Sequence, residues 1–220
     1  MNYPLSIWIL IACLILIFII RQISVVLKKK FIRLITTPLI TYFICGIAAV
    51  GIYNYGSGIE WMILAALGLS LIADAVLMIE NRDLFTHGLI FFLGTHIFYI
   101  IVFSEWYRFL WSDIPAGIIL LGLMAFLVYK FYKAGNLGAM MFPVIGYITA
   151  LSLVVFFSLN GAFQNGDTSS YLIACGAVLF YISDAILGWT QFVKYYKLTT
   201  LYVWFFYAPG QFLIALSLLY

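Results

Sequence analysis

Long apolar segments follow one another through the whole chain, separated by short clusters of polar residues. A bilayer core about 30 Å thick is crossed by about 20 residues of α-helix, so each segment has the length of a transmembrane helix. We predict eight of them, at about 4–20, 34–53, 60–80, 86–104, 114–132, 139–160, 170–190 and 199–219. Because only 9% of the residues are charged, a soluble surface could not be built. The sequence therefore predicts an all-α, polytopic membrane protein.

These spans leave no room for a soluble domain, so residues 1–220 are expected to form a single transmembrane domain. The net charge is only +3, and no basic patch of the kind that binds nucleic acid is present. We expect the lipid bilayer to be the main partner and no nucleic acid to be bound. The compact loops and the lack of sorting signals favour a multi-pass protein of a bacterial cytoplasmic (inner) membrane.

Basic residues are concentrated in alternate loops. Ten of the 11 Lys and Arg fall on one side of the predicted topology: Arg21, Lys28, Lys29, Lys30, Arg33, Arg82, Lys130, Lys133, Lys194 and Lys197. Only Arg108 falls on the other side. Because short cytoplasmic loops carry the excess of Lys and Arg, this distribution predicts that both termini face outward, N-out and C-out.

Two aspartates, Asp74 and Asp184, lie inside apolar runs, and each begins an Asp-Ala-(Val/Ile)-Leu tetrapeptide. A carboxylate at membrane depth costs roughly 2.5–3.5 kcal/mol on insertion scales, so such residues usually serve a function. The alternative is that the two acids, with neighbouring Ser70 and Ser183, only hold helices together, although Ser or Thr would do this at lower cost. The matching tetrapeptides are also consistent with a 4+4 internal duplication.

Further polar side chains are predicted at a similar depth. His96 and Tyr99 are three residues apart on one helical face, and Gln211 follows Pro209-Gly210 in the last span. Tyr147 and Tyr207 are candidates to line a pocket beside them. We expect these groups to cluster in the inner half and the middle of the membrane, although a membrane His or Gln is about as often a hydrogen-bonding residue between helices.

A metal site has little support in the sequence. Two histidines exclude a three-histidine zinc site, and a mixed site of His96, Asp74 and Asp184 has no recognisable spacing. We therefore predict neither a metal nor another cofactor.

Four segments resemble the YhhN family of membrane lysoplasmalogenases: LSLIADAVLM at 69–78, GLIFFLGTHIFY at 88–99, GAVLFYISDAIL at 176–187 and YAPGQFLI at 207–214. The length and the eight-span layout are similar too, while Pro209-Gly210 departs from the small apolar residues usual before the glutamine. The resemblance implies hydrolysis of the vinyl ether bond of a lysoplasmalogen, with a lysophospholipid as substrate and a fatty aldehyde as product. It also implies that Asp74 and Asp184 are catalytic and that His96 and Gln211 match family positions.

Vinyl ether hydrolysis suits two carboxyl groups. The reaction begins with protonation of the β-carbon, which requires a positioned acid at neutral pH rather than a nucleophile. Of two neighbouring carboxyl groups in an apolar site, one tends to keep its proton, while the other can stabilise a cation and activate water. We expect His96, Tyr99, Gln211, Ser70, Ser183 and Tyr207 to bind and orient the substrate, with Arg82 or Lys194 near its phosphate.

The main alternative is a proton-coupled membrane transporter that uses the two aspartates as a relay. The few hydrogen-bonding side chains in the spans speak against a polar transported solute. No lysine lies in the middle of the last two spans, which disfavours a retinal-binding photosensor.

Overall fold

The computed structural model describes residues 5–56, 58–79 and 84–220. Within these ranges the chain forms helices and no strands. The long helices are α1 (Leu5–Val26), α2 (Lys30–Tyr55), α3 (Trp61–Leu77), α4 (Phe85–Glu105), α5 (Ile114–Lys133), α6 (Met141–Asn165), α7 (Thr168–Phe192) and α8 (Thr199–Leu216). Short 3₁₀ helices lie at η1 (Trp111–Asp113), η2 (Gly138–Met140) and η3 (Ser217–Leu219). The all-α prediction is therefore confirmed.

The observed helices match the predicted spans one for one, but some ends differ. The first span was predicted to end at residue 20, whereas α1 continues to Val26. Arg21 is therefore a buried helical residue and not a loop residue. The third span was predicted to reach residue 80, whereas α3 ends at Leu77. Arg82, assigned to the following loop, lies outside the described residues.

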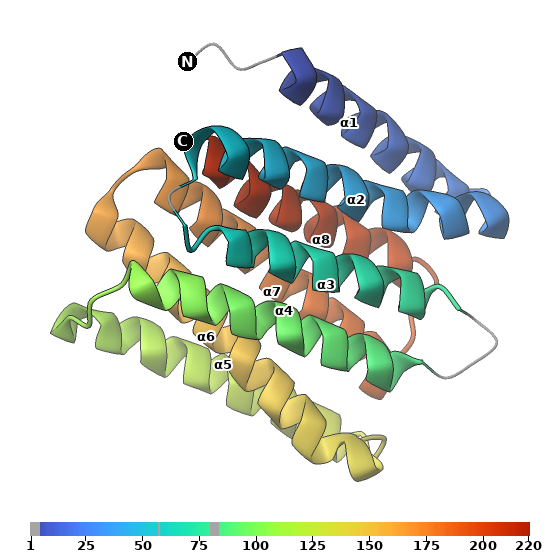
Figure 1. Cartoon of the computed structure of the whole chain (residues 1–220). Coiled ribbons are helices and arrows are strands. Elements are labelled where there is room, and N and C mark those ends of the chain that lie inside the picture. Colours follow the sequence, from blue (N-terminus) through green and yellow to red (C-terminus); the bar gives the residue numbers. More distant parts are fainter. Residues whose placement is uncertain (1–4, 57, 80–83) are drawn as a thin grey trace.

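Successive helices run in alternating directions, and α1 begins on the side where α8 ends (Figure 1). The closest pairs are α7 with α8, α3 with α4, α1 with α2, α2 with α3 and α6 with α7. Helices α1 and α5 lie at opposite edges of the bundle (Figure 1), and each buries only 17% of the residues in its most apolar stretch. The other helices surround the interior in which both aspartates lie.

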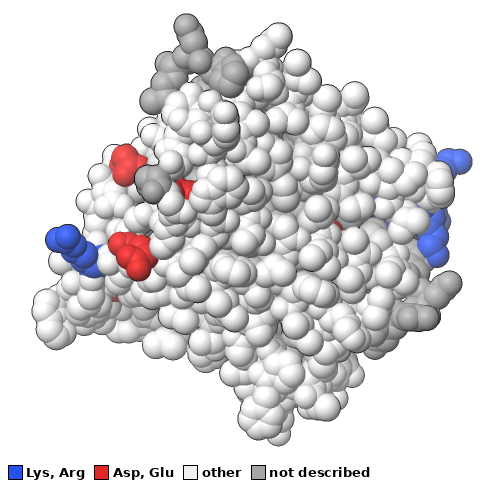
Figure 2. All heavy atoms as spheres, viewed as in Figure 1, with Lys and Arg blue, Asp and Glu red and all other residues white. Residues whose placement is uncertain are grey.

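Seven of the described helices are long and apolar enough to cross a membrane, and α3, at 17 residues, is a shorter apolar helix. The face in Figure 2 carries charged groups near its two ends and a broad uncharged middle. Large apolar side chains such as Leu16, Phe142 and Phe163 are more than half exposed, which is costly in water and favourable in lipid. The chain is an integral membrane protein.

Glycines allow the tightest contacts between neighbouring helices. Gly176 of α7 and Gly210 of α8 face each other so closely that a Cβ on Gly176 would lie 2.6 Å from the carbonyl oxygen of Gly210. Gly166 ends α6 with a left-handed φ of 69°, and the side chain of Asp167 then caps α7 by accepting a hydrogen bond from the Ser170 amide. Small residues and short caps thus fix α6, α7 and α8 against one another.

Three connections lie at the same end of the bundle: α1–α2, α5–α6 and α7–α8 (Figure 1). The first carries Lys28 and Lys29, the second follows Lys133, and the third carries Lys194 and Lys197. We call this end the basic side. Its cytoplasmic location, and with it the N-out/C-out orientation, stays a prediction, as do the 4+4 duplication and the single domain over 1–220.

Candidate active site

A central cavity of about 280 Å³ lies between α2, α3, α4, α7 and α8 and extends toward the α7–α8 connection on the basic side. Both Asp74 and Asp184 line it, although 110 residues separate them in the sequence. The remaining lining residues are Thr37, Leu77, Met78, Phe92, Ser183, Leu187, Thr190, Gln191, Tyr195, Thr199, Thr200, Val203, Trp204 and Tyr207. The two acids thus lie in the wall of a single cavity.

Asp74 is held by hydroxyl groups from two other helices. It lies three residues before the end of α3 and is only 4% exposed. The hydroxyl of Thr41 in α2 donates a hydrogen bond to its Oδ2, and the hydroxyl of Tyr207 in α8 donates another at 2.8 Å. Tyr207 itself packs edge-on against Phe92. Thr41 was not among the residues predicted for the site.

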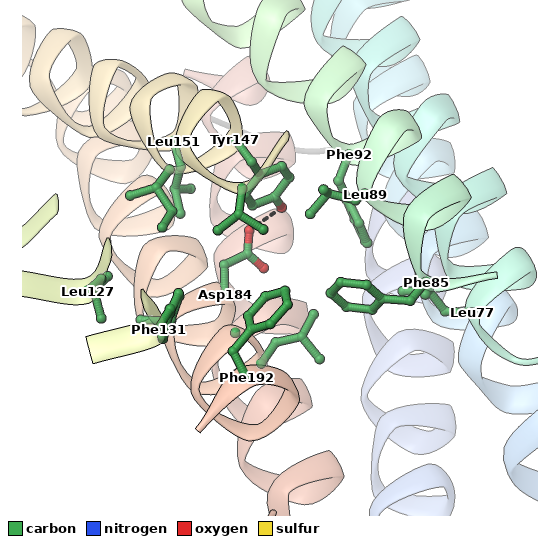
Figure 3. A pocket seen from close by; sticks show the side chains of 15 residues that line it. Leu77, Phe85, Leu89, Phe92, Leu127, Phe131, Tyr147, Leu151, Asp184 and Phe192 are labelled. Atoms are coloured by element: carbon green, nitrogen blue, oxygen red, sulfur yellow. Dashed lines mark hydrogen bonds between the residues drawn. The ribbon is translucent and has the colours of Figure 1, made fainter. Parts of the chain in front are cut away.

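Asp184 has a different set of partners. The hydroxyl of Tyr147 in α6 donates a 2.5 Å hydrogen bond to its Oδ2, and the two side chains point toward one another (Figure 3). Nε2 of His96 lies 3.5 Å from the same oxygen. The imidazole is fully buried between the rings of Tyr147 and Phe180, at 4.9 and 5.0 Å between ring centres. A protonated His96 would form an ion pair with Asp184, whereas a neutral one supports it through packing.

A second polar group lies deeper in the bundle and does not line the cavity. The hydroxyl of Tyr99 donates to Oε1 of Gln211 at 2.6 Å, and the Gln211 amide donates to the hydroxyl of Ser70 at 3.0 Å. Ser70 also lies 3.0 Å from the hydroxyl of Thr95, which donates to the carbonyl of Ala66. All four side chains are fully buried. They tie α3, α4 and α8 together beside the aspartates, and Thr95 is a further member that the sequence did not reveal.

Ser183 differs from this closed group because its hydroxyl has no hydrogen-bond partner within the part of the chain that the structure describes. It lies next to Asp184 in the chain and lines the central cavity. A buried hydroxyl without a partner costs about 1–3 kcal/mol, so it favours a bound polar group or water at this point.

An apolar pocket of about 40 Å³ adjoins the central cavity (Figure 3). The two share Leu77, Phe92, Asp184 and Leu187 in their walls. The rest of the apolar pocket is lined by Phe85, Leu89, Leu127, Phe131, Val144, Tyr147, Ile148, Leu151, Ala185, Gly188 and Phe192. Asp184 therefore lies at the junction of a polar and an apolar compartment.

The described part of the chain holds no group of three His, Cys, Asp or Glu side chains arranged to bind a metal ion. His96 lies near Asp184, while Asp74 accepts hydrogen bonds from Thr41 and Tyr207. Of the basic residues predicted near a substrate phosphate, Lys194 is exposed and packs against the ring of Tyr196. Arg82 lies outside the described residues.

Residues 30–218 match the model of the YhhN family. The chain belongs to the YhhN family. The matched range includes both aspartates and every helix that lines the central cavity, and of the long helices it leaves out only α1. The range that matches the family model therefore includes every residue that lines the central cavity.

Two curated proteins are similar to this YhhN member. Lysoplasmalogenase TMEM86B of Mus musculus is 29% identical over 165 residues, which cover 74% of this chain and 66% of that protein. Lysoplasmalogenase TMEM86B of Rattus norvegicus is 28% identical, over 74% of this chain and 64% of that protein. The chain thus spans just under two thirds of the length of these relatives. No solved structure is significantly similar to it.

Proposed function

We propose that this protein is a membrane lysoplasmalogenase that hydrolyses the vinyl ether bond of a lysophospholipid, with Asp74 and Asp184 as its acid/base pair. The observation that carries the proposal is that two carboxyl groups from distant parts of the chain line one cavity inside a membrane bundle. Similarity to two lysoplasmalogenases supports the choice of substrate. We further propose a bacterial cytoplasmic membrane as its location.

The reaction needs one proton donor and one proton acceptor. A protonated carboxyl group gives its proton to the β-carbon of the vinyl ether, and an oxocarbenium ion forms at the α-carbon. The ionised partner stabilises this cation and takes a proton from the attacking water, which gives a hemiacetal. The hemiacetal then breaks into a fatty aldehyde and the glycerol hydroxyl of the head group, so that one water is consumed. Paired carboxyl groups serve glycoside hydrolysis in a related way.

Neighbouring side chains would hold the two carboxyl groups in fixed positions. Thr41 and Tyr207 both donate to Asp74, while Tyr147 donates to Asp184 with His96 beside it. Fixed donors of this kind remove the need to reorganise water as charge develops, and one such donor is typically worth a factor of about 10²–10³ in rate. Ser183, with its unpaired hydroxyl, is placed to hold the attacking water.

The two compartments would divide the substrate between them. The few carbons of the alkenyl chain next to the vinyl ether would enter the small apolar pocket lined by Phe85, Phe131 and Phe192, while the glycerophospho group would occupy the central cavity toward the basic side. The vinyl ether would then lie at their junction, next to Asp184. Ser70, Tyr99 and Gln211 would position α3, α4 and α8 rather than touch the lipid, since they are fully buried and line neither compartment.

The test compares three lipids with the same chain and head group: a 1-alkenyl, a 1-alkyl and a 1-acyl glycerophosphoethanolamine. Purified protein should release fatty aldehyde from the first and nothing from the other two, because only a vinyl ether carries a carbon basic enough to protonate. In D₂O the aldehyde, reduced at once to the alcohol, should carry one deuterium at carbon 2. Fatty acid release from the ester would contradict the proposal. Solute movement across vesicles without bond cleavage would favour the proton-coupled transporter.

A further inference from the structure

Arg21 of α1 is a buried cation that forms no salt bridge with an acidic side chain among the described residues, although Asp74 is close enough to act on it electrostatically. Its side chain has no exposed surface. Nη1 donates to the carbonyl of Thr200 at 3.1 Å and to Oε1 of Gln22 at 2.7 Å, but Nε and Nη2 have no hydrogen-bond partner among the described residues. The guanidinium keeps its charge in proteins, and a buried charge that no acidic side chain pairs with directly is costly. The unused donors therefore favour an anionic ligand.

The arginine lies directly behind the wall of the central cavity. Two residues that contact it also line the cavity: Thr200, through its carbonyl, and Trp204, whose ring lies 4.4 Å from the guanidinium carbon. Thr37 of α2 is part of the same wall, and its hydroxyl is also buried without a hydrogen-bond partner in the described ranges. At 1.5 Å per residue, Arg21 is about 8 Å from the end of α1 and Thr37 about 10 Å from the start of α2, hence at a similar depth.

We propose that Arg21, together with Thr37, binds the phosphate group of the substrate head group at the basic end of the central cavity, with the ring of Trp204 moving aside to admit it. This inference rests on the proposed function for the identity of the ligand. Arginine presents several N–H groups in one plane and suits a phosphate better than a lysine does. In a lysophospholipid the phosphate is the group that always carries a negative charge, so it is the anion that this arginine would meet.

Lys194 and Lys197 fit this role less well. Both are exposed on the α7–α8 connection, and neither lines the central cavity. Exposed charges are screened by salt and contribute little to the binding of a single group. Arg21 also lies before residue 30, outside the range that matches the family model.

The experiment measures binding, so that it does not depend on hydrolysis. The probes are a 1-alkyl glycerophosphocholine, which has no vinyl ether, the matching 1-alkylglycerol, which has no phosphate, and inorganic phosphate. The variants are Arg21→Met and Arg21→Lys, with Lys197→Met as the control that removes one exposed charge from the same side. Calorimetry in detergent gives Kd, and thermal unfolding reports whether each variant is folded.

We expect Arg21→Met to raise the Kd of the phospholipid by about 10- to 100-fold, the range of one charged hydrogen-bonding group. Arg21→Lys should raise the Kd of the phospholipid by a smaller but measurable factor. This variant replaces Arg21→Met in the experiment if Arg21→Met does not fold. The alkylglycerol should bind every variant within twofold of the wild type, and Lys197→Met should bind both lipids normally.

Equal losses for both lipids would mean that Arg21 only holds α1 against α8, and unchanged binding would mean that it meets no phosphate. Either result overturns the inference. If inorganic phosphate binds as tightly as the lipid and with the same dependence on Arg21, the site takes free phosphate and the assignment to the head group is wrong. A protein that binds the phospholipid through Arg21 but releases no aldehyde would leave this inference standing and refute the proposed function.

Discussion

The close contact between α7 and α8 predicts a large effect of a small substitution, Gly176→Ala. An added Cβ would lie 2.6 Å from the carbonyl oxygen of Gly210 and 2.7 Å from Cγ1 of Ile214. Ordinary van der Waals contact begins near 3.4 Å, so α8 would have to move away from α7. The carbonyl is backbone and cannot rotate aside as a flexible side chain would. The whole helix must therefore shift.

The expected cost follows from two opposing terms. Overpacking of a well-packed interior typically costs about 1–3 kcal/mol. Alanine is a better helix former than glycine by up to about 1 kcal/mol, which offsets part of this cost. We expect a net loss of about 1–2 kcal/mol in the free energy of unfolding, and a lower activity, because α8 carries Tyr207, whose hydroxyl donates to Asp74.

Thermal unfolding of the purified protein in detergent checks this estimate. The matched control is Gly161→Ala in α6, also at a buried helical glycine, where the added Cβ would meet no atom within 4 Å. It should leave the unfolding temperature unchanged or raise it slightly, since only the helix-propensity term remains. If Gly176→Ala behaves like Gly161→Ala, α7 and α8 are not in the close contact described here and the reasoning fails.

Three further substitutions test other parts of the structure. Tyr147→Phe removes the 2.5 Å hydrogen bond to Asp184 and should lower the rate of aldehyde release about 10²- to 10³-fold with little change in unfolding temperature; a wild-type rate would contradict the role of this donor. Gln211→Leu leaves Tyr99 without its partner and Ser70 with Thr95 alone, so it should lower the free energy of unfolding by about 1–3 kcal/mol while the KM of the remaining activity stays near the wild-type value; a large rise in KM would instead indicate direct substrate binding. Gly166→Ala forces a side chain into a left-handed turn with φ of 69° and should cost about 1–2 kcal/mol in the same unfolding assay, unless the α6–α7 turn can rearrange.

The spans could be predicted from the sequence because apolar length alone decides what crosses a bilayer. The end of α1 could not. Arg21, Gln22 and Ser24 look like the start of a loop, yet they remain helical. In α8, the Thr200 carbonyl accepts from Arg21 and the Leu201 carbonyl from Gln22, while the Ser24 hydroxyl donates to the Arg21 carbonyl within α1. A polar residue ends an apolar run in the sequence, but contacts with another helix decide whether it ends the helix.

The site, like the fold, could be predicted from the sequence only in part. Asp74 and Asp184 stand out because a carboxyl group in an apolar run is costly, and both line one cavity. Thr41 carries no such signal, since a threonine in a helix commonly bonds its own preceding turn, as Thr36 and Thr149 do here. Only the packing of α2 against α3 distinguishes Thr41 from them.

The most direct test of the central claim, that two carboxyl groups act together in one cavity, is the rate of aldehyde release by Asp74→Asn, Asp184→Asn and the double variant. Residues that act as a unit are strongly non-additive, so each single variant should lose at least about 10³-fold and the double variant should lose about as much as either one. All three should unfold near the wild-type temperature. A single variant that keeps wild-type activity, or a double variant in which the two losses multiply, would contradict the account.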